Sequence, residues 1–144
     1  MKHLCLLCLV LLLPFCLFAE SDDDTLKYYL SKSQLVIEGK IATSPSGQTD
    51  EVDVFTYFFD FQVSDVLKGD AKFKGQTIAV HLVCLQRGKW DENPLLKKDT
   101  RCILFLNEKP ASGFSAWIGA DFWFAIQYPS SVMAEHLKRL AKEK

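Results

Sequence analysis

Cysteine is the residue type whose spacing most readily suggests chemistry in this chain of 144 residues, which contains five of them. Cys5 and Cys8 are separated by two residues, the spacing of a thiol redox motif. Cys84 and Cys102 lie much later, each within an apolar segment. What these thiols can do depends on whether the N-terminal pair stays in the functioning protein.

The N-terminal segment is typical of an export signal. Lys2 and His3 give it a basic start, residues 4–18 form an uncharged apolar run, and Ala19 precedes an acidic stretch. We therefore expect residues 1–19 to be a cleaved signal peptide and residues 20–144 to form a single domain that is secreted or periplasmic.

Two kinds of membrane anchor compete with this interpretation and fit less well. The apolar run contains Pro14 and is shorter than the ~20 residues that a membrane-spanning helix needs. A lipid anchor would require a small residue before the acylated cysteine, but the bulky Phe15 precedes Cys16. We expect no stable membrane anchor after cleavage.

Cleavage would also remove the apparent redox motif. Cys5, Cys8 and Cys16 leave with the signal, so the mature chain keeps only Cys84 and Cys102. An even pair in an oxidising compartment predicts a disulfide between them, formed across two neighbouring strands. The alternative is a pair of buried thiols that act as small hydrophobic side chains.

The other residue types that perform catalysis are present without a supporting pattern. His81 and His136 are far apart and have no further ligand at metal spacing, so His81 is interpreted as a surface or partly bonded strand residue. Asp60 interrupts an aromatic strand on the side that carries Thr56 and Gln62, which favours a solvent-facing charge over a general acid or base. The sequence indicates no catalytic residue, no cofactor site and no metal site, and we expect a protein that is not an enzyme.

The charge balance argues against nucleic acid as a partner. Without residues 1–19 the chain has sixteen Lys and Arg against eighteen Asp and Glu, a net charge of −2. Nucleic-acid binders usually carry a basic surface, which this composition does not supply.

Alternating apolar residues predict a mainly β domain. The strongest alternation buries one face of a long strand through Phe55, Tyr57, Phe59, Phe61 and Val63, and strands this long are typical of closed barrels. A short helix is expected over residues 21–32 and a second helix from Pro129 onward. The expected strands are residues 34–43, 51–67, 76–85, 100–107, 114–118 and 122–128. We predict a five- to six-stranded OB-like antiparallel barrel with a short N-terminal helix and a C-terminal helix.

Three tryptophans are the candidate contact residues. Trp90 lies in a long polar loop, residues 86–99, and Trp117 and Trp123 lie near the last strands. Long loops in small domains are often functional, and aromatic platforms on OB-type barrels bind ligands. The alternative is that most of these rings belong to the core.

The order of the elements resembles the netrin-like module family, which includes the tissue inhibitors of metalloproteinases. The resemblance spans residues 25–107 and rests on a short helix followed by Ser33-Gln-Leu-Val-Ile-Glu-Gly-Lys-Ile, Phe59-Asp-Phe-Gln-Val-Ser-Asp-Val-Leu-Lys-Gly and Arg101-Cys-Ile-Leu-Phe-Leu. It implies an OB-type barrel similar to those of related bacterial secreted domains. The metalloproteinase inhibitors bind zinc through an N-terminal cysteine, and no cysteine lies between the expected mature start and Cys84, so that activity is not implied here.

The sequence thus favours a secreted or periplasmic, non-enzymatic module that binds a protein or an envelope component. Two alternatives stay open. The family resemblance suggests an inhibitor of an extracellular metalloprotease or other hydrolase, and an enzyme with an unrecognised site would require a polar pocket with converging carboxylates.

Overall fold

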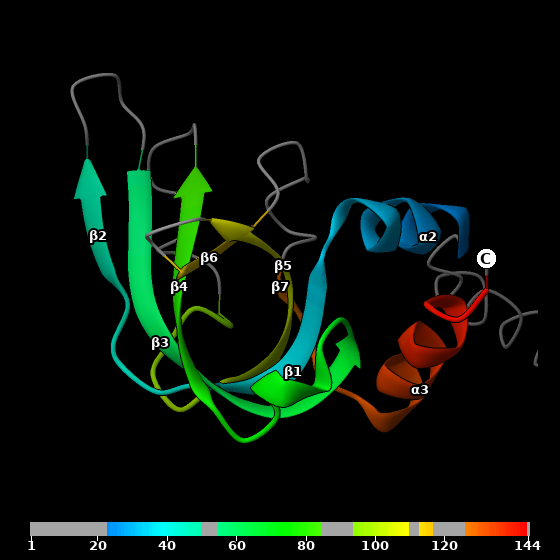
Figure 1. The fold of residues 1–144 in the computed structure, drawn as a ribbon. Coiled ribbons are helices and arrows are strands. Elements are labelled where there is room, and N and C mark those ends of the chain that lie inside the picture. The colour runs from blue at the N-terminus through cyan, green and yellow to red at the C-terminus, as the bar shows by residue number, and fades with distance from the viewer. Residues whose placement is uncertain (1–22, 50–54, 85–93, 110–112, 117–125, 144) are drawn as a thin grey trace, which may run out of the picture.

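Two helices lie on one side of a β-barrel in the computed structural model of the chain (Figure 1). The structure describes residues 23–49, 55–84, 94–109, 113–116 and 126–143. The helices are α2 (Asp23–Lys32) and α3 (Ser131–Leu140), with a short 3-10 helix η1 (Ala71–Phe73). The strands are β1 (Leu35–Ile41), β2 (Ser46–Thr49), β3 (Phe55–Lys68), β4 (Thr77–Cys84), β5 (Arg101–Lys109), β6 (Gly113–Ala116) and β7 (Ile126–Gln127). The predicted signal peptide lies outside the described residues.

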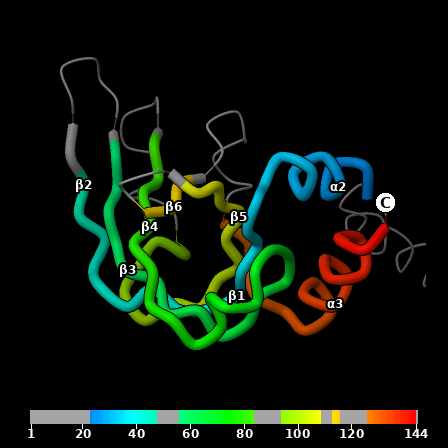
Figure 2. The backbone as a smooth tube through the Cα atoms, viewed as in Figure 1, coloured from blue at the N-terminus to red at the C-terminus, as the bar shows by residue number. Residues whose placement is uncertain are grey.

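Five strands close the barrel in the order β1-β3-β4-β6-β5, with β5 pairing back to β1. The β4–β6 pair is parallel and the other pairs are antiparallel. This is the strand order of an OB-type barrel, and the backbone tube in Figure 2 shows the ring that these strands form. β2 is paired to β3 and β7 to β5 outside this ring. The predicted OB-like barrel with flanking helices is confirmed.

The barrel interior is filled by the inward-facing residues of every second position. On β3 these are Tyr57, Phe59, Phe61 and Val63, as the alternation predicted. The cluster also contains Leu35, Ile37, Ile41, Ile78, Val80, Leu82, Leu95, Leu96, Cys102, Leu104, Leu106, Phe114 and Ile126. Side chains therefore pack the barrel as a core.

A second cluster lies between the barrel and the two helices. Ile103 and Phe105 of β5 point outward into it, which explains why both faces of this strand are apolar. The other members are Leu26, Leu30, Val36, Leu67, Ala134, Leu137 and Leu140. The helices thus cover the outer face of β1 and β5.

Part of the loop predicted as a contact surface belongs to the core. Leu95 and Leu96 are buried in the barrel cluster. Lys97, Lys98 and Asp99 that follow them are exposed, and the N–H of Asp99 donates to the carbonyl of Ile41 at 2.8 Å. This end of the loop therefore anchors the connection to β5, a role that its polar composition did not reveal.

β1 is shorter than predicted, and the following residues form a strand that the sequence did not predict. β1 ends at Ile41, and β2 begins at Ser46 on the same edge of β3. The stretch Ser46-Gly-Gln-Thr49 has no apolar alternation, so it was expected to be a turn. It becomes a strand because the long β3 offers backbone groups that extend past β1.

Gly39 allows β1 to approach β3 closely. The pairing of the two strands shifts register between Glu38 and Gly39, which is a β-bulge. A Cβ at Gly39 would lie 2.1 Å from the carbonyl oxygen of Gln62 and 2.7 Å from the Phe61 ring. The close approach of the two strands therefore requires a residue without a side chain at this position.

The end of β3 connects the barrel to α2. Leu67 is buried in the helix-side cluster, and the Lys68 ammonium donates to the carbonyl oxygens of Leu30 and Ser33. These carbonyls lie at the C-terminal end of α2, where helix carbonyls lack intrahelical partners. Gly69 follows with φ of 107°, a conformation that favours glycine. The Leu-Lys-Gly segment thus caps the helix and turns the chain.

Ion pairs at the barrel surface hold α3. Ser130 caps the helix by accepting from the Met133 N–H at 3.0 Å. Lys138 reaches from α3 to Asp65 of β3 at 2.8 Å, and Lys74 contacts the same carboxylate at 3.0 Å. The hydrogen bond from Lys138 lowers the pKa of Asp65 below its usual value, although burial opposes this shift.

We expect Asp65→Asn to lower the free energy of unfolding at pH 7 by about 0.5–1 kcal/mol, because the ion pairs are partly exposed. Since the pKa of Asp65 is lower in the folded protein than in the unfolded chain, its contribution is present above the ordinary value of 3.8 and is lost as the pH falls below it. Urea unfolding at pH 7 and pH 3 measures both effects. The variant should lose less stability on acidification than the wild type, and equal losses would contradict the assignment.

Candidate functional site

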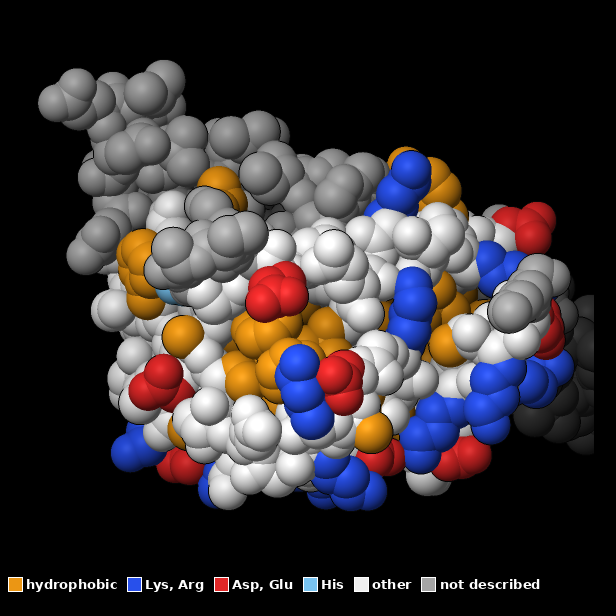
Figure 3. Space-filling model, in the orientation of Figure 1, with side chains coloured by type: hydrophobic (Ala, Val, Ile, Leu, Met, Phe, Trp, Pro, Cys, Tyr) orange, Lys and Arg blue, Asp and Glu red, His pale blue; other side chains and the backbone are white. Residues whose placement is uncertain are grey.

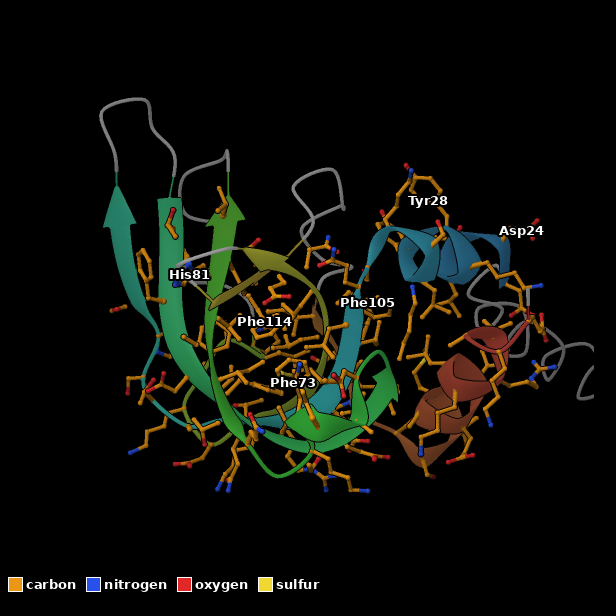
Figure 4. The ribbon with its side chains drawn as sticks, in the orientation of Figure 1. Asp24, Tyr28, Phe73, His81, Phe105 and Phe114 are labelled. Atoms are coloured by element: carbon orange, nitrogen blue, oxygen red, sulfur yellow. The ribbon has the colours of Figure 1, made fainter. Side chains whose placement is uncertain are left out.

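A hollow of about 330 Å³ lies on the outer face of β3 and β4, beside the connection from β1 to β2. This is the side of the barrel away from α2 and α3, where Figure 4 labels His81. The hollow is lined by Thr43, Ser44, Ser46, Phe58, Phe59, Asp60, Ala79, Val80 and His81. We call it the β3–β4 groove.

An aromatic pair forms one wall of the β3–β4 groove. Phe58 and His81 lie directly opposite each other in the β3–β4 register. Their ring centroids are 4.7 Å apart with an angle of 65° between the planes, an edge-to-face contact. Because the rings do not stack, one of them keeps ring faces that the other does not cover. Both residues are half-buried.

Hydroxyl groups form the opposite wall because the chain breaks from β1 to β2. The Ala42 N–H donates to the Asp60 carbonyl at 2.8 Å, and the Asp60 N–H donates to the Thr43 hydroxyl at 2.8 Å. Ser44 follows, and the Ser46 hydroxyl lies 3.5 Å from the Phe58 carbonyl, a weak contact. Three hydroxyl-bearing residues therefore line the groove together with the aromatic pair.

Asp60 contributes the charge of the β3–β4 groove. Its side chain is exposed, as the alternation with Thr56 and Gln62 predicted. Within the described part of the chain, no lysine, arginine or histidine forms an ion pair with Asp60. Its carboxylate oxygens are thus available to accept hydrogen bonds from a ligand.

Apolar side chains also gather at one end of the barrel. Figure 3 shows them in the centre of the view, where Figure 4 labels Phe73 and Phe114. Their rings meet edge to face at 5.1 Å, and the Lys72 ammonium lies 5.0 Å from the centre of the Phe73 ring. Phe114 is buried and Phe73 packs against the barrel core. This surface closes the barrel, and its Lys72 ammonium is paired with the Asp70 carboxylate at 3.1 Å.

The sequence-predicted contact residues are not placed by the structure. Trp90, Trp117 and Trp123 lie outside the described residues. His136, interpreted as an ordinary helix residue, bonds across the helices: its Nε2 lies 2.7 Å from an Asp23 oxygen. Arg139 lies 2.8 Å from the other ring nitrogen of this histidine.

The predicted disulfide is not formed in the structure. Cys102 is a free, buried thiol opposite Gly39 of β1. Cys84 ends β4, and β6 lies between β4 and β5 in the barrel order, so the cysteines are not on neighbouring strands. The prediction of cross-strand neighbours was wrong because it assumed that consecutive long strands pair directly. β6 lies between these two strands in the barrel, and the residue pattern of neither strand indicates this.

We expect Cys102 to resist alkylation in the folded protein. Burial raises the pKa of its thiol to about 12, so at pH 8 almost no reactive thiolate is present. Iodoacetamide should label the tryptic peptide that follows Arg101 only after denaturation, as read by mass spectrometry. Labelling under native conditions, or a disulfide-linked form of this peptide in the unreduced sample, would contradict the free buried thiol.

The described residues contain no group of three His, Cys, Asp or Glu side chains that could hold a metal ion. Neither of the helices in the described ranges is long and apolar enough to cross a membrane. No protein-family model and no curated protein matches the chain. What the protein binds must therefore be inferred from its own side chains.

Sequence reasoning placed two groove residues correctly and missed the others. The alternation put Phe58 and Asp60 on the outward side of β3. Phe58 is an aromatic residue on an otherwise polar strand face, and this is the signal in the sequence that indicates a contact surface there. Thr43 ends the strand predicted over residues 34–43, and Ser44 and Ser46 lie between the predicted strands, so only the three-dimensional structure shows that all three line the groove.

Proposed function

We propose that this protein is a secreted or periplasmic, non-enzymatic module that binds a protein or an envelope component through the β3–β4 groove. The observation that carries the proposal is the joint presence of an aromatic pair, an exposed carboxylate and three hydroxyls in one hollow of the barrel wall. Sites with a ring surface and a few polar groups of fixed direction are typical of specific binding.

Three outward-facing groove residues lie outside the buried clusters, which supports this role. Phe58, Asp60 and His81 all point away from the barrel core, and none belongs to either buried cluster. The two helices pack on β1, β5 and the C-terminal end of β3, on the opposite side of the barrel from His81.

Affinity capture tests the proposal. Immobilised protein is incubated with envelope extract and culture medium, and recovery is compared for the wild type, Phe58→Ala, Asp60→Asn and Trp90→Ala. Tyr128→Ala removes an aromatic side chain that is 66% exposed, and Glu135→Gln neutralises an exposed carboxylate on α3. These two variants are matched controls, because neither residue lines the β3–β4 groove.

We expect one component to be recovered by the wild type and both controls and to be reduced about tenfold by Phe58→Ala and Asp60→Asn, a loss of about 1.4 kcal/mol. Equal recovery by all variants would exclude the groove as the contact surface. Loss of recovery with Trp90→Ala alone would show that the contact lies in the loop of residues 86–99. Recovery of no component by any form would contradict a binding function.

A further inference from the structure

We infer that the β3–β4 groove binds a neutral oligosaccharide, an inference that rests on the proposed function and names the ligand of the same site. Three properties of the groove point to this class: the charge of the surrounding sheet face, the aromatic pair, and the hydroxyl groups around Asp60.

Within the described residues, β3 and β4 carry no lysine or arginine on the face that bears the groove, and Lys40 of β1 lies beside this face, opposite Gln62. The outward-facing cross-strand pairs of β3 and β4 are Thr56–Val83, Phe58–His81, Asp60–Ala79 and Gln62–Thr77. None of these eight residues is a lysine or an arginine, and Asp60 supplies a negative charge. Nucleic acids and other phosphate-bearing ligands depend on basic side chains for affinity and would be repelled by this carboxylate. Among the described residues of β3 and β4, the groove therefore offers an anionic ligand a carboxylate and no lysine or arginine.

The aromatic pair suits the apolar face of a sugar ring. One face of many pyranose rings presents only C–H groups, which carry partial positive charge. The face of an aromatic ring is negative, and its edge is positive. The edge-to-face contact does not stack Phe58 on His81, so the half-buried Phe58 ring is the surface on which a sugar ring can pack.

The polar wall suits the hydroxyl groups of the same ligand. A carboxylate accepts several hydrogen bonds at once, so Asp60 can bind two neighbouring sugar hydroxyls. The Thr43 hydroxyl already accepts from the Asp60 N–H at 2.8 Å, which fixes its position and leaves its own hydrogen to donate. The hydroxyls of Ser44 and Ser46 can both donate and accept, the two roles that a sugar hydroxyl also has.

The size of the groove limits the ligand. A volume of about 330 Å³ lies at the low end of the range of small-molecule sites. The groove is therefore matched to one or two sugar rings of a chain, with the rest of the chain outside it.

A basic peptide is the competing ligand. An arginine or lysine side chain could contact the Phe58 ring through a cation–π interaction and pair with Asp60. The sugar is favoured because the three hydroxyls and Asp60 match a ligand with many hydroxyl groups, whereas a strongly basic segment would call for more than one carboxylate.

Calorimetric titration tests the inference with the folded protein. The probes are neutral trisaccharides of β-1,4-linked glucose, α-1,4-linked glucose and β-1,4-linked N-acetylglucosamine, a tetra-arginine peptide, and a single-stranded oligonucleotide. The proteins are the wild type, Phe58→Ala, Asp60→Asn, and the control variants Tyr128→Ala and Glu135→Gln. Thermal unfolding shows whether each variant is folded. If Phe58→Ala does not fold, Asp60→Asn, which changes an exposed residue, still tests the site.

We expect at least one neutral trisaccharide to bind, with an affinity that falls about tenfold or more in each groove variant and stays unchanged in the controls. Absence of binding by every trisaccharide overturns the inference, as does sugar binding that the groove variants leave unchanged. Binding of the peptide or the oligonucleotide in place of sugar also overturns it. The proposed function fails separately, when affinity capture shows no component that depends on the groove.

Discussion

Gly39→Ala is expected to lower the free energy of unfolding by about 3 kcal/mol or more. The added Cβ would lie 2.1 Å from the carbonyl oxygen of Gln62, a distance that no side-chain rotation can relieve. β1 would have to move away from β3, and Gly39 also pairs with Cys102 of β5. One methyl group would therefore disturb two seams of the barrel.

Gly47→Ala is the matched control for this substitution. Gly47 also lies in a strand paired with β3, but its added Cβ would meet only the Tyr57 ring, at 3.2 Å. A ring can shift by a few tenths of an ångström, so we expect a cost within about 1 kcal/mol. Urea unfolding measures both variants, and equal costs would show that the bulge at Gly39 does not require a glycine.

Lys68→Met is expected to lower the free energy of unfolding by about 2–3 kcal/mol. The substitution keeps an unbranched apolar chain but removes the donor to the carbonyl oxygens of Leu30 and Ser33. Those oxygens lie at the end of α2. The Leu30 oxygen also accepts from the Ser33 N–H at 3.3 Å, so the Ser33 oxygen is the acceptor that loses its partner, and an unpaired buried acceptor costs about 1–3 kcal/mol. Burial lowers the pKa of Lys68, so its charge already carries a desolvation cost that methionine relieves in part.

Lys72→Met is the control, because its side chain is 64% exposed and makes only surface contacts with Asp70 and the Phe73 ring within the described residues. We expect a change below about 0.5 kcal/mol there. Hydrogen exchange locates the effect: the amides of α2 should lose protection in Lys68→Met before those of β3 and β4. Uniform loss across all elements would show that Lys68 does not act through the helix end.

The barrel could be predicted because its strands alternate in composition, whereas the order of the strands around it could not. The burial of Phe59 and Phe61 follows from the alternation of residue types along their strand. The insertion of β6 between β4 and β5 depends on contacts between distant segments, and this is why Cys84 and Cys102 were assigned to neighbouring strands.

In the candidate site, too, only the residues set by strand periodicity could be predicted from the sequence. The outward direction of Phe58 and Asp60 follows from strand periodicity alone. Thr43, Ser44 and Ser46 reach the groove because the chain breaks between β1 and β2. The residue pattern of 44–49 alone predicts a turn. Residues brought to a site by a strand break carry no periodic signal, so the structure was needed to find them.

The seam between β1 and β5 has a consequence for how fast the chain folds. Leu35 at the start of β1 lies opposite Leu106 near the end of β5. The ring therefore closes only when these two strands, which are far apart in the sequence, pair with each other. Chains dominated by such distant pairings lose more conformational entropy before the first stabilising contacts form, and they fold in milliseconds to seconds. Until that meeting, β1 and β5 each expose an unpaired backbone edge. The interval before ring closure is therefore when this protein is most open to aggregation.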